Sequence, residues 1–574
     1  MSFDEKENSE IFKDFFSKLA ENLLLKLPEP PKKFGPLETT EYYRKFNLTT
    51  NGFRFSKVSL EIVQDILENI EPSKAAGIDN LNGKFLRDAA KAIALPITQL
   101  CNLSIKYSSF PSACKIAKLK PIFKKGSKTD PKNYRPISLL PLISKVIEKV
   151  VHDQTKKYLD DHEIIFNYQS GFRENHSTDF VLSFLNDKIL KGFDKGLYTG
   201  MVLIDLQKAF DTIDHEILLQ KMFFLGFSKS VINWFKCYLS NRTFLVNIND
   251  KFSNPGTLTC GVPQGSILGP LLFLLYVNDM QQAVQSNLLL YADDSCIFYQ
   301  DKNVKVIEEQ LTKDFSNLCD WFVDNKLSIH LGEDKTKSIL FGSKHKLKSA
   351  KKLHLKYHDI EIKQHSNVCY LGCILNESLS GDPMGLNVIK KINARLRFLY
   401  RNTKILSSSL RRMLLNSLIQ PNFDYASLSW FPNLTEKVRK KIQTAQNKCI
   451  RFCLQLENKA HIGLNELKSI NWLNTSDRYK QICCSSVFKY FNKRSPSFMS
   501  EIFKASQQGT IYTRQSYLKL EQPLMKTSKG QNALSFQASR EWNKLPKDIK
   551  EVKNINTFKH KVKEFYFHQI ELKE

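Results

Sequence analysis

Residues 288–298 read LLLYADDSCIF. Two adjacent carboxylates, Asp293 and Asp294, stand between two apolar segments of the β type, which predicts a β-hairpin with its acids at the turn. An Asp pair at a hairpin tip is ordinarily turn chemistry alone, because aspartate tolerates turn conformations. A second acidic segment elsewhere in the chain favours a functional interpretation instead.

That second segment is MVLIDL at residues 201–206, an apolar strand pattern that contains Asp205. A carboxylate in such a strand is costly to bury unless a cation or another partner compensates its charge. Three aspartates on two neighbouring strands would repel each other unless hard cations lay among them. Mg²⁺ binds carboxylate, water and phosphate oxygens, and a pair of such ions promotes in-line phosphoryl transfer. Asp205, Asp293 and Asp294 are therefore candidate ligands of two Mg²⁺ ions for nucleotidyl transfer, with Mn²⁺ as a substitute.

Strand and helix patterns alternate around these acids, which predicts an α+β region with a sheet from 197 to 345. The expected strands are 201–206, 243–248, 288–299 with a central turn, and 338–341, and the expected helices are 215–224 and one after Ser266. We expect Asp211 and Asp214 to cap the helix that begins near His215.

The flanking regions are mostly helical. We expect an amphipathic helix within residues 1–27, followed by a Pro- and Lys-rich linker over 28–36. Further helical patterns cover 58–159 (interrupted by a strand at 119–123), 385–455, 478–491 and 557–566. In the 385–455 segment, apolar residues follow one helix face at Val438, Ile442, Ala445, Cys449 and Phe452.

The net charge points to a polyanionic partner. The 574 residues include 85 Lys+Arg and 58 Asp+Glu, a formal charge of +27. Much of this excess lies in two segments, since residues 115–157 contain twelve basic and three acidic residues and residues 385–455 contain fourteen and two. Such an excess of positive over negative charge is typical of a nucleic-acid-binding surface, whereas an ordinary protein surface mixes charges of both signs.

Several protein classes are excluded. The start, MSFDEKENSE, lacks an apolar signal region, and the longest apolar stretch, 267–277, is interrupted by Gly269 and Pro270. The twelve cysteines lack the paired spacing of zinc fingers, so we expect mostly buried, reduced thiols. These features predict an intracellular protein, in nucleus or cytoplasm, that does not enter a membrane.

An ordered series of motifs resembles reverse transcriptases. The central motifs are IDLQKAFDTIDH at 204–215, GVPQGSILGP at 261–270 and YADD at 291–294; KPIFKKG at 120–126 and NYRPIS at 133–138 precede them, and NKLSI at 325–329, KT at 335–336 and YLG at 370–372 follow. QSGFR at 169–173, with Ser177 and Thr178, is similar to a segment of non-LTR (LINE-type) elements. The tail from Ser535 through WNKLP at 542–546 resembles the jockey-like non-LTR polyproteins.

The resemblance implies a right-hand polymerase fold, with fingers, a palm built on an antiparallel sheet, a helical thumb and a mainly helical C-terminal region. The expected divisions are an N-terminal helix and linker at 1–55, fingers and the start of the palm at 56–196, palm at 197–380, thumb at 381–455 and the C-terminal region at 456–574. Jockey-like elements normally encode an endonuclease ahead of the polymerase. About 50 residues precede the fingers here, so we expect that domain to be lacking and target nicking to reside in a separate protein.

The resemblance also implies roles for individual residues. Asp205 and Asp293 would bind the two metal ions, with Asp294 completing the acidic cluster. Arg135 would contact the incoming triphosphate, for which a guanidinium offers bidentate hydrogen bonds. A second phosphate contact is expected from one of three nearby lysines, Lys120, Lys124 and Lys125. The resemblance does not indicate which of them makes it.

Four further residues have a matching role and an ordinary alternative. Phe210 matches the steric gate that excludes a ribose 2′-hydroxyl and so favours dNTPs, although it also suits a core aromatic position. Gln264 and Gly265 match the turn beside the nascent base pair, where Gly265 could equally serve the turn alone. Lys335 matches the general acid toward pyrophosphate, although surface lysines are common.

The leading hypothesis is an RNA-directed DNA polymerase of non-LTR retrotransposon type, which extends a DNA primer at the target on an RNA template with dNTPs. One alternative is a decayed or domesticated copy that acts only as an RNA-binding protein. Another is an RNA-dependent RNA polymerase, which would prefer rNTPs and keep that preference in Phe210→Ala.

Overall fold

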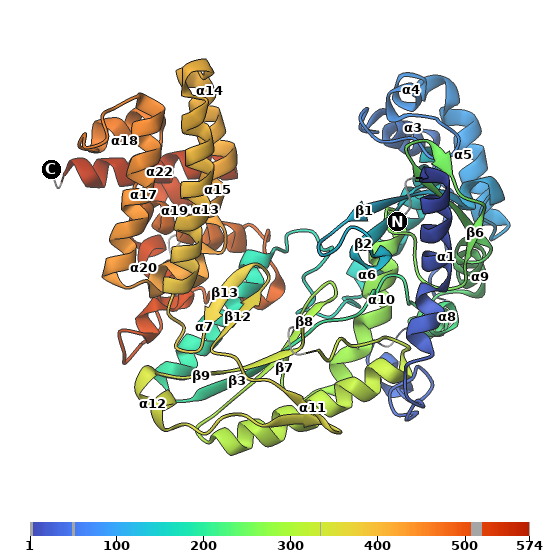
Figure 1. Cartoon of the computed structure of the whole chain (residues 1–574), viewed down its shortest axis with the longest axis horizontal. Coiled ribbons are helices and arrows are strands. Elements are labelled where there is room, and N and C mark those ends of the chain that lie inside the picture. Colours follow the sequence, from blue (N-terminus) through green and yellow to red (C-terminus); the bar gives the residue numbers. More distant parts are fainter. Residues whose placement is uncertain (1–3, 47, 49–51, 333–334, 507–518, 573–574) are drawn as a thin grey trace, which may run out of the picture. The chain divides into compact units, whose positions relative to one another are not determined.

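The computed structural model describes residues 4–46, 48, 52–332, 335–506 and 519–572. The chain divides into two compact units (Figure 1). The first unit comprises Met1–Phe166, Asp205–Gln285 and Asp314–His330, and the second comprises Asn167–Ile204, Ser286–Lys313 and Leu331–Glu574. The chain thus passes from the second unit to the first directly after Ile204. Asp205 therefore belongs to a different unit from Asp293 and Asp294.

A five-stranded sheet forms part of the first unit. Its strands are β1 (Ile116–Phe123), β2 (Tyr134–Leu139), β4 (Arg242–Ile248), β5 (Lys251–Phe252) and β6 (Gly256–Leu258). They pair in the order β2-β1-β4-β5, with β6 also on β4, and β1 is antiparallel to β2 but parallel to β4. The predicted strands at 119–123 and 243–248 are confirmed as β1 and β4.

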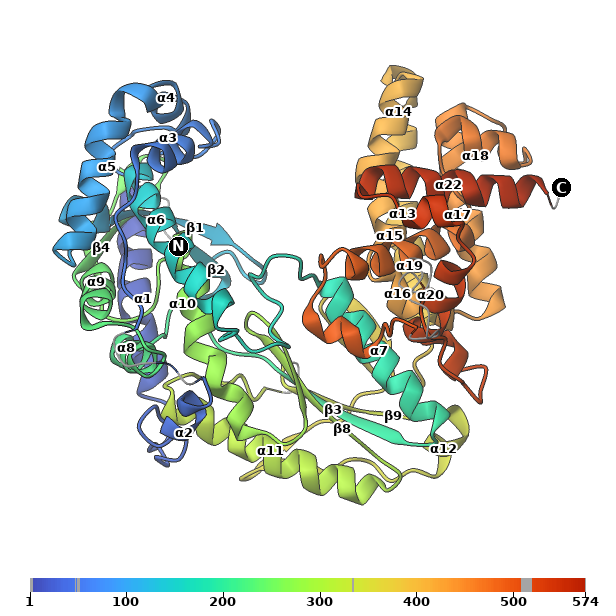
Figure 2. The same cartoon turned by 180° about the vertical axis from the view of Figure 1, so that it is seen from behind.

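Helices of the first unit pack on this sheet and on one another. They are α1 (Glu5–Leu24), α2 (Thr40–Arg44), α3 (Leu60–Glu68), α4 (Gly83–Asp88), α5 (Ala90–Lys106), α6 (Leu142–Asp161), α8 (His215–Phe224), α9 (Lys229–Leu239) and α10 (Leu268–Val277). The predicted N-terminal amphipathic helix is confirmed as α1, whose Phe12 and Phe16 are buried against Phe244 and Val246 of β4. Figure 2 shows α1 running along this sheet.

The predicted linker at 28–36 contains no helix or strand, and its second half is bound to the first unit. The backbone N–H groups of Lys32, Lys33 and Phe34 donate to the carboxylate of Asp324 at 2.8, 2.7 and 2.7 Å. The Phe34 side chain is buried. Three backbone donors on one carboxylate form a concave anion site, so this segment is a fixed connection rather than a solvated tether.

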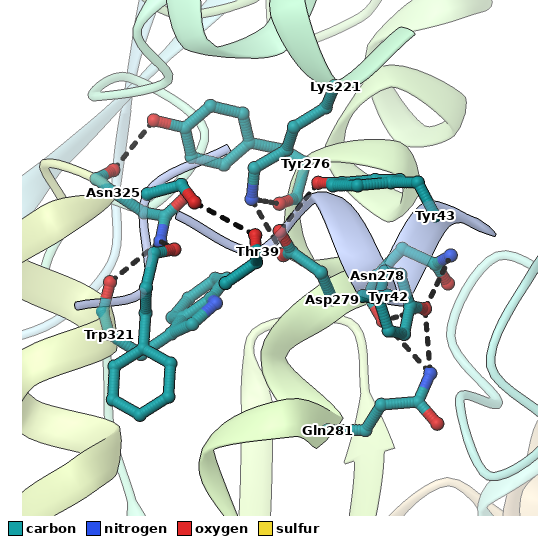
Figure 3. Close-up of polar contacts among 12 residues, drawn as sticks. Thr39, Tyr42, Tyr43, Lys221, Tyr276, Asn278, Asp279, Gln281, Trp321 and Asn325 are labelled. Atoms are coloured by element: carbon teal, nitrogen blue, oxygen red, sulfur yellow. Dashed lines mark hydrogen bonds and ion pairs between the residues drawn. The ribbon is translucent and has the colours of Figure 1, made fainter. Parts of the chain in front are cut away.

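Helix α2 follows that segment and covers a buried ion pair (Figure 3). Lys221 of α8 and Asp279 lie 2.7 Å apart, and both side chains are 1% exposed. The Lys221 Nζ also donates to the Tyr276 carbonyl at 2.6 Å, and the Tyr43 hydroxyl donates to Asp279 at 2.8 Å. Burial lowers the pKa of Lys221, and burial together with the nearby Asp279 raises the pKa of Tyr43. Burial thus opposes the charge on Lys221, and Asp279 offsets part of that cost.

A four-stranded antiparallel sheet is central to the second unit. Its strands are β3 (Tyr198–Ile204), β7 (Asn287–Tyr291), β8 (Asp294–Asp301) and β9 (Lys337–Phe341), in the order β7-β8-β3-β9. All seven residues of β3 are buried because both faces of the strand are covered. Met201 and Leu203 join the core formed with α7 (Thr178–Asp194), whereas Gly200 packs against Ile307 and Leu311 of α11 (Val304–Asp324).

Small strands and many helices complete the second unit (Figures 1 and 2). The strands are β10 (Leu355–Tyr357), β11 (Ile360–Ile362), β12 (Asn367–Tyr370) and β13 (Cys373–Asn376). The helices are α12 (Lys344–Ser349), α13 (Asp382–Arg401), α14 (Ser408–Leu414), α15 (Gln420–Asp424), α16 (Ser427–Trp430), α17 (Glu436–Leu454), α18 (Leu464–Ile470), α19 (Thr475–Phe491), α20 (Leu534–Asn543), α21 (Lys547–Lys550) and α22 (Ile555–Glu571). The apolar face predicted for 438–452 is confirmed, since all five of its residues are buried in α17.

Helix α13 packs its apolar face on the core and exposes its cations. Ile392 and Leu396 are buried, whereas Lys390, Arg395 and Arg397 are exposed. The cysteines match expectation, because all twelve are free thiols and nine of them are buried. Within the described residues, no helix combines the length and the apolar character that a bilayer span requires.

Candidate active site

The Asp293–Asp294 pair lies at the tip of the β7–β8 hairpin, as the sequence predicts. Tyr291 pairs with Asp294, so the turn consists of Ala292 and Asp293. Ala292 adopts the left-handed conformation, with φ 56°, which a non-glycine residue seldom adopts. Both aspartates are exposed. The hairpin thus presents two adjacent carboxylates to solvent at the turn between two paired strands.

Asp205 follows strand β3 rather than lying within it. The expected strand 201–206 is therefore corrected, because β3 ends at Ile204, which pairs with Ser295 of β8. Leu206 instead forms an isolated bridge with Ile329 in the first unit, and the Asp205 carbonyl accepts from the His330 N–H at 2.9 Å. The Asp205 side chain is half-buried at the point where the chain leaves the sheet.

The predicted catalytic residues are divided between the two units. Asp205 belongs to the first unit, and Asp293, Asp294 and Lys335 belong to the second. Lys335 is half-buried two residues before β9, whose Lys337 pairs with Leu203, so it approaches the same end of the sheet as Asp294. Among the residues that the structure describes, no group of three or more His, Cys, Asp or Glu side chains is arranged to bind a metal ion.

Asp211 does not cap α8, and the expectation for this residue is wrong. Its Oδ1 accepts from the Gln264 side-chain amide at 2.8 Å, and burial raises the pKa of Asp211 to about 6. Asp211 lies in a turn that follows the left-handed residue Lys208, with φ 50°, and the helix begins only at His215. Asp214 is the cap, as predicted, because its carboxylate accepts from the Ile217 N–H at 3.0 Å.

Gln264 and Gly265 lie against β2. The Gln264 carbonyl accepts from the Ser138 N–H at 2.8 Å. Gly265 has φ 125°, and a Cβ atom there would lie 2.6 Å from the Ser138 carbonyl oxygen. A side chain is thus incompatible with this close approach of two backbones. The requirement for glycine at 265 is met within the protein, which supports the turn interpretation of this residue.

Phe210 packs on the helix that follows the Gln264 turn. Its ring stacks on Phe273 of α10, with centroids 4.5 Å apart and planes 18° apart. The side chain is half-buried, so part of it faces solvent. This geometry is compatible with both interpretations of Phe210, as a core aromatic and as a steric gate. One part of the ring contacts the core, and another part remains accessible.

The predicted phosphate-binding residues lie on the β1–β2 hairpin. Arg135 pairs with Ile122, and Lys120 pairs with Ile137. The side chains of Arg135, Lys120, Lys124 and Lys125 are all exposed. This unit therefore presents a cluster of cations on one two-stranded ribbon.

The sequence did not indicate two hydrogen bonds that are made beside the predicted site residues. Asp211 binds Gln264, and Gln169 binds the backbone of Ala292 in the Asp-Asp turn at 3.0 Å. Both lie within recognised motifs, FD at 210–211 and QSGFR at 169–173. Their position within these motifs was the only feature of the sequence that could have drawn attention to them. A motif does not indicate which distant backbone or side chain a residue contacts.

Comparison with known proteins supports the sequence resemblance. Residues 122–375 match the family model "Reverse transcriptase (RNA-dependent DNA polymerase)". The chain is 27% identical over 407 residues to a probable RNA-directed DNA polymerase from transposon BS of Drosophila melanogaster, which covers 69% of this chain and 44% of that protein. For the X-element polymerase of the same organism, identity is 27% over 446 residues, with 76% and 47% covered.

A further relative is the RNA-directed DNA polymerase from mobile element jockey of Drosophila funebris. It is 30% identical over 285 residues, which cover 48% of this chain and 31% of that protein. The chain thus spans less than half the length of each of these relatives.

Proposed function

This chain carries a reverse transcriptase domain related to those of non-LTR retrotransposons, and from this premise we propose that it is an RNA-directed DNA polymerase. It would transfer a nucleotidyl group from a dNTP to the 3′-oxygen of a DNA primer, paired with an RNA template, and release pyrophosphate. One observation carries the proposal most directly. The β7–β8 hairpin exposes Asp293 and Asp294 at the sheet end where β3 leads into Asp205.

The donor chemistry of these residues fits divalent metal ions. Asp293 and Asp294 are exposed, so their hard oxygen atoms are accessible to a cation that keeps several water and phosphate ligands. We propose that Asp205, Asp293 and Asp294 would bind two Mg²⁺ ions, with Mn²⁺ as a substitute. When bound, such ions stabilise the attacking and leaving oxygens of an in-line transfer.

The residues of the first unit would bind the incoming nucleotide. Arg135 would contact the triphosphate through bidentate hydrogen bonds, and Lys120 and Lys124 would add phosphate contacts. The accessible part of Phe210 would lie where a ribose 2′-hydroxyl would clash. The turn at Gln264 and Gly265, which Asp211 fixes through the Gln264 amide, would border the nascent base pair.

In the second unit, Lys335 would protonate the leaving pyrophosphate. Helix α13, with buried Ile392 and exposed Lys390 and Arg395, has the amphipathic layout of a helix that contacts a phosphate backbone. We propose the corresponding divisions of the chain, with an N-terminal helix and linker at 1–55, fingers and the start of the palm at 56–196, palm at 197–380, thumb at 381–455 and a helical C-terminal region at 456–574.

The test is primer extension with the purified chain, an RNA template annealed to a DNA primer, dNTPs and Mg²⁺. Asp293→Ala/Asp294→Ala should abolish incorporation, and a thermal unfolding curve of the same preparation shows that the variant is folded. Asp301→Ala, at the other end of β8, is the matched control and should remain active.

Incorporation that persists in the double variant would refute the assignment. RNA binding with no incorporation by the native chain, in either Mg²⁺ or Mn²⁺, would instead support a protein that only binds RNA. Nucleotide choice separates the polymerase classes, because Phe210→Ala should admit rNTPs only if the native enzyme selects dNTPs.

A further inference from the structure

The QSGFR motif, to which the proposed reaction assigns no role, lies directly beside the catalytic hairpin. We call residues 167–173 the strap. The Tyr168 carbonyl accepts from the Leu290 N–H at 3.1 Å, and the Ser170 N–H donates to the Leu290 carbonyl at 2.8 Å. Gln169 thereby forms a parallel bridge with Leu290 of β7. The strap therefore extends the sheet edge at the strand that leads into the Asp293–Asp294 turn.

The Gln169 side chain contacts the turn itself. It is 2% exposed, and its Oε1 accepts from the Gly171 N–H at 2.8 Å and from the Ala292 N–H at 3.0 Å. Ala292 immediately precedes Asp293 and has the left-handed φ noted above. A non-glycine residue persists in that conformation only where surrounding contacts fix it. The Gln169 carbonyl oxygen is such a contact.

Close packing reinforces this hydrogen bond. A Cβ atom at Gly171 would lie 2.1 Å from the Ala292 nitrogen, so the strap and the turn approach more closely than any side chain at 171 allows. The Gln169 Nε2 is buried and has no hydrogen-bond partner among the described residues. Leaving that donor unsatisfied costs free energy, and the hydrogen bonds that the side chain makes to Gly171 and Ala292 both use its oxygen.

We propose that Gln169 is a positioning residue that fixes the Asp293–Asp294 turn in its catalytic geometry by binding the Ala292 backbone. This inference rests on the proposed polymerase function. Gln169 touches no reacting atom and acts through the direction in which the turn presents the two carboxylates.

The C-terminal region supports the strap from the other side. The Tyr168 ring stacks on Phe498, with centroids 5.6 Å apart and planes 14° apart. The Tyr168 hydroxyl donates to Glu501 at 2.5 Å, and Lys188 of α7 binds the second oxygen of the same carboxylate at 2.7 Å. A region that follows the proposed thumb in sequence is thus connected through Tyr168 and Gln169 to the Asp-Asp turn.

The test compares Gln169→Met with Gln300→Met in the full chain. Methionine keeps the length of the side chain and removes the oxygen acceptor. Gln300, on β8, also donates hydrogen bonds in the second unit, to the Lys188 carbonyl and the Thr199 hydroxyl, and neither partner belongs to the turn. The measurements are kcat and KM for dNTP, the Kd for primer–template, the Mg²⁺ concentration at half-maximal rate, and the thermal midpoint.

We expect Gln169→Met to lower kcat by about tenfold or more, because small misplacements of reacting groups are costly in rate. The half-maximal Mg²⁺ concentration should rise, and the primer–template Kd should stay unchanged. Gln169→Glu, which retains an acceptor, should recover part of kcat. Gln300→Met should leave kcat and the Mg²⁺ dependence unchanged even where its thermal midpoint falls.

An unchanged kcat in a folded Gln169→Met, or equal losses in both variants, would overturn the proposal. If Gln169→Met does not fold, Tyr168→Phe is tested in its place. This change keeps the stacking on Phe498 and removes the hydrogen bond to Glu501. Tyr168→Phe should lower kcat by a smaller factor than Gln169→Met, and an unchanged kcat would refute the positioning role of the strap.

Failure of the polymerase function itself remains distinguishable. If the native chain incorporates no nucleotide, hydrogen exchange at the Ala292 amide reports on the strap without any need for activity. Faster exchange in Gln169→Met than in Gln300→Met would support the contact, and equal exchange would reject it.

Discussion

Asp279 and the Asp293–Asp294 pair show two opposite ways of using a carboxylate. Asp279, in the first unit, is buried and binds Lys221 and Tyr43 (Figure 3). Asp293 and Asp294, in the second unit, are exposed on a hairpin tip. A carboxylate whose charge is compensated inside the protein contributes to structure, whereas an exposed pair on a rigid support is available to external cations. Asp211 is intermediate, because its buried carboxylate is bonded to an amide instead of a cation.

The largest effect is expected at the exposed pair and concerns activity alone. Asp293→Asn removes a negative oxygen from the proposed metal site, and we expect the incorporation rate to fall by roughly 10⁴-fold, about 5 kcal/mol in activation free energy. The free energy of unfolding should be unchanged. Primer extension and urea denaturation of the same preparation measure both quantities, and a marked loss of stability would contradict the comparison.

Breaking the buried pair should have the converse result. Lys221→Met leaves Asp279 buried without its cation, and we expect the free energy of unfolding to fall by about 3–5 kcal/mol. Lys236→Met, at an exposed lysine of α9, is the control and should change stability by less than about 0.5 kcal/mol. Denaturant unfolding measures the free energy of unfolding of both variants. Equal losses in Lys221→Met and Lys236→Met would show that burial of the ion pair is unimportant.

A smaller effect is expected where only one hydrogen bond to Asp279 is removed. Tyr43→Phe keeps the ring and the stacking on Phe224 but deletes the hydroxyl that donates to Asp279 at 2.8 Å. We expect a loss of about 1.5–3 kcal/mol, the usual range for a hydrogen bond to a charged group. A double-mutant cycle that combines Tyr43→Phe with Lys221→Met tests whether the two contacts to Asp279 are coupled. Additive losses in the free energy of unfolding would show that they are independent.

A further effect should appear at Asp211, as a pH dependence of stability. Its pKa is raised from 3.8 to about 6 in the folded protein, so the folded state binds more protons than the unfolded state between these values. The stability that Asp211 contributes is full below pH 3.8 and is lost as the pH rises through about 6. Asp211→Asn keeps the acceptor for Gln264 and should remove this decline, as unfolding measured across that window would show.

The sequence predicted the Asp293–Asp294 hairpin because the information that defines it is local. Apolar residues on either side of Asp293 and Asp294 are enough to define two strands and a turn, and Asp214 lies at the usual capping distance from Ile217. The amphipathic pattern of α17 was legible for the same reason, since its apolar residues repeat every three or four positions.

Predictions that depended on distant partners failed or could not be made. The 28–36 segment looked like a linker, yet Phe34 donates to Asp324, 290 residues away in sequence. Asp211 looked like a helix cap, but its partner Gln264 lies 53 residues away. No composition or periodicity indicates such pairs, because they form only when the intervening chain has folded.

By itself, the sequence determined the order of the motifs, the mixed α/β class, the hairpin that presents the two aspartates and the family whose model residues 122–375 match. The tertiary structure alone decided that β3 ends before Asp205, that Asp211 binds Gln264 and that Gln169 fixes Ala292 from 123 residues away. The physical reason is the range of the interactions. Strand, turn and cap preferences act between near neighbours in the chain, whereas the hydrogen bonds that orient these side chains join segments that only the folded core brings together.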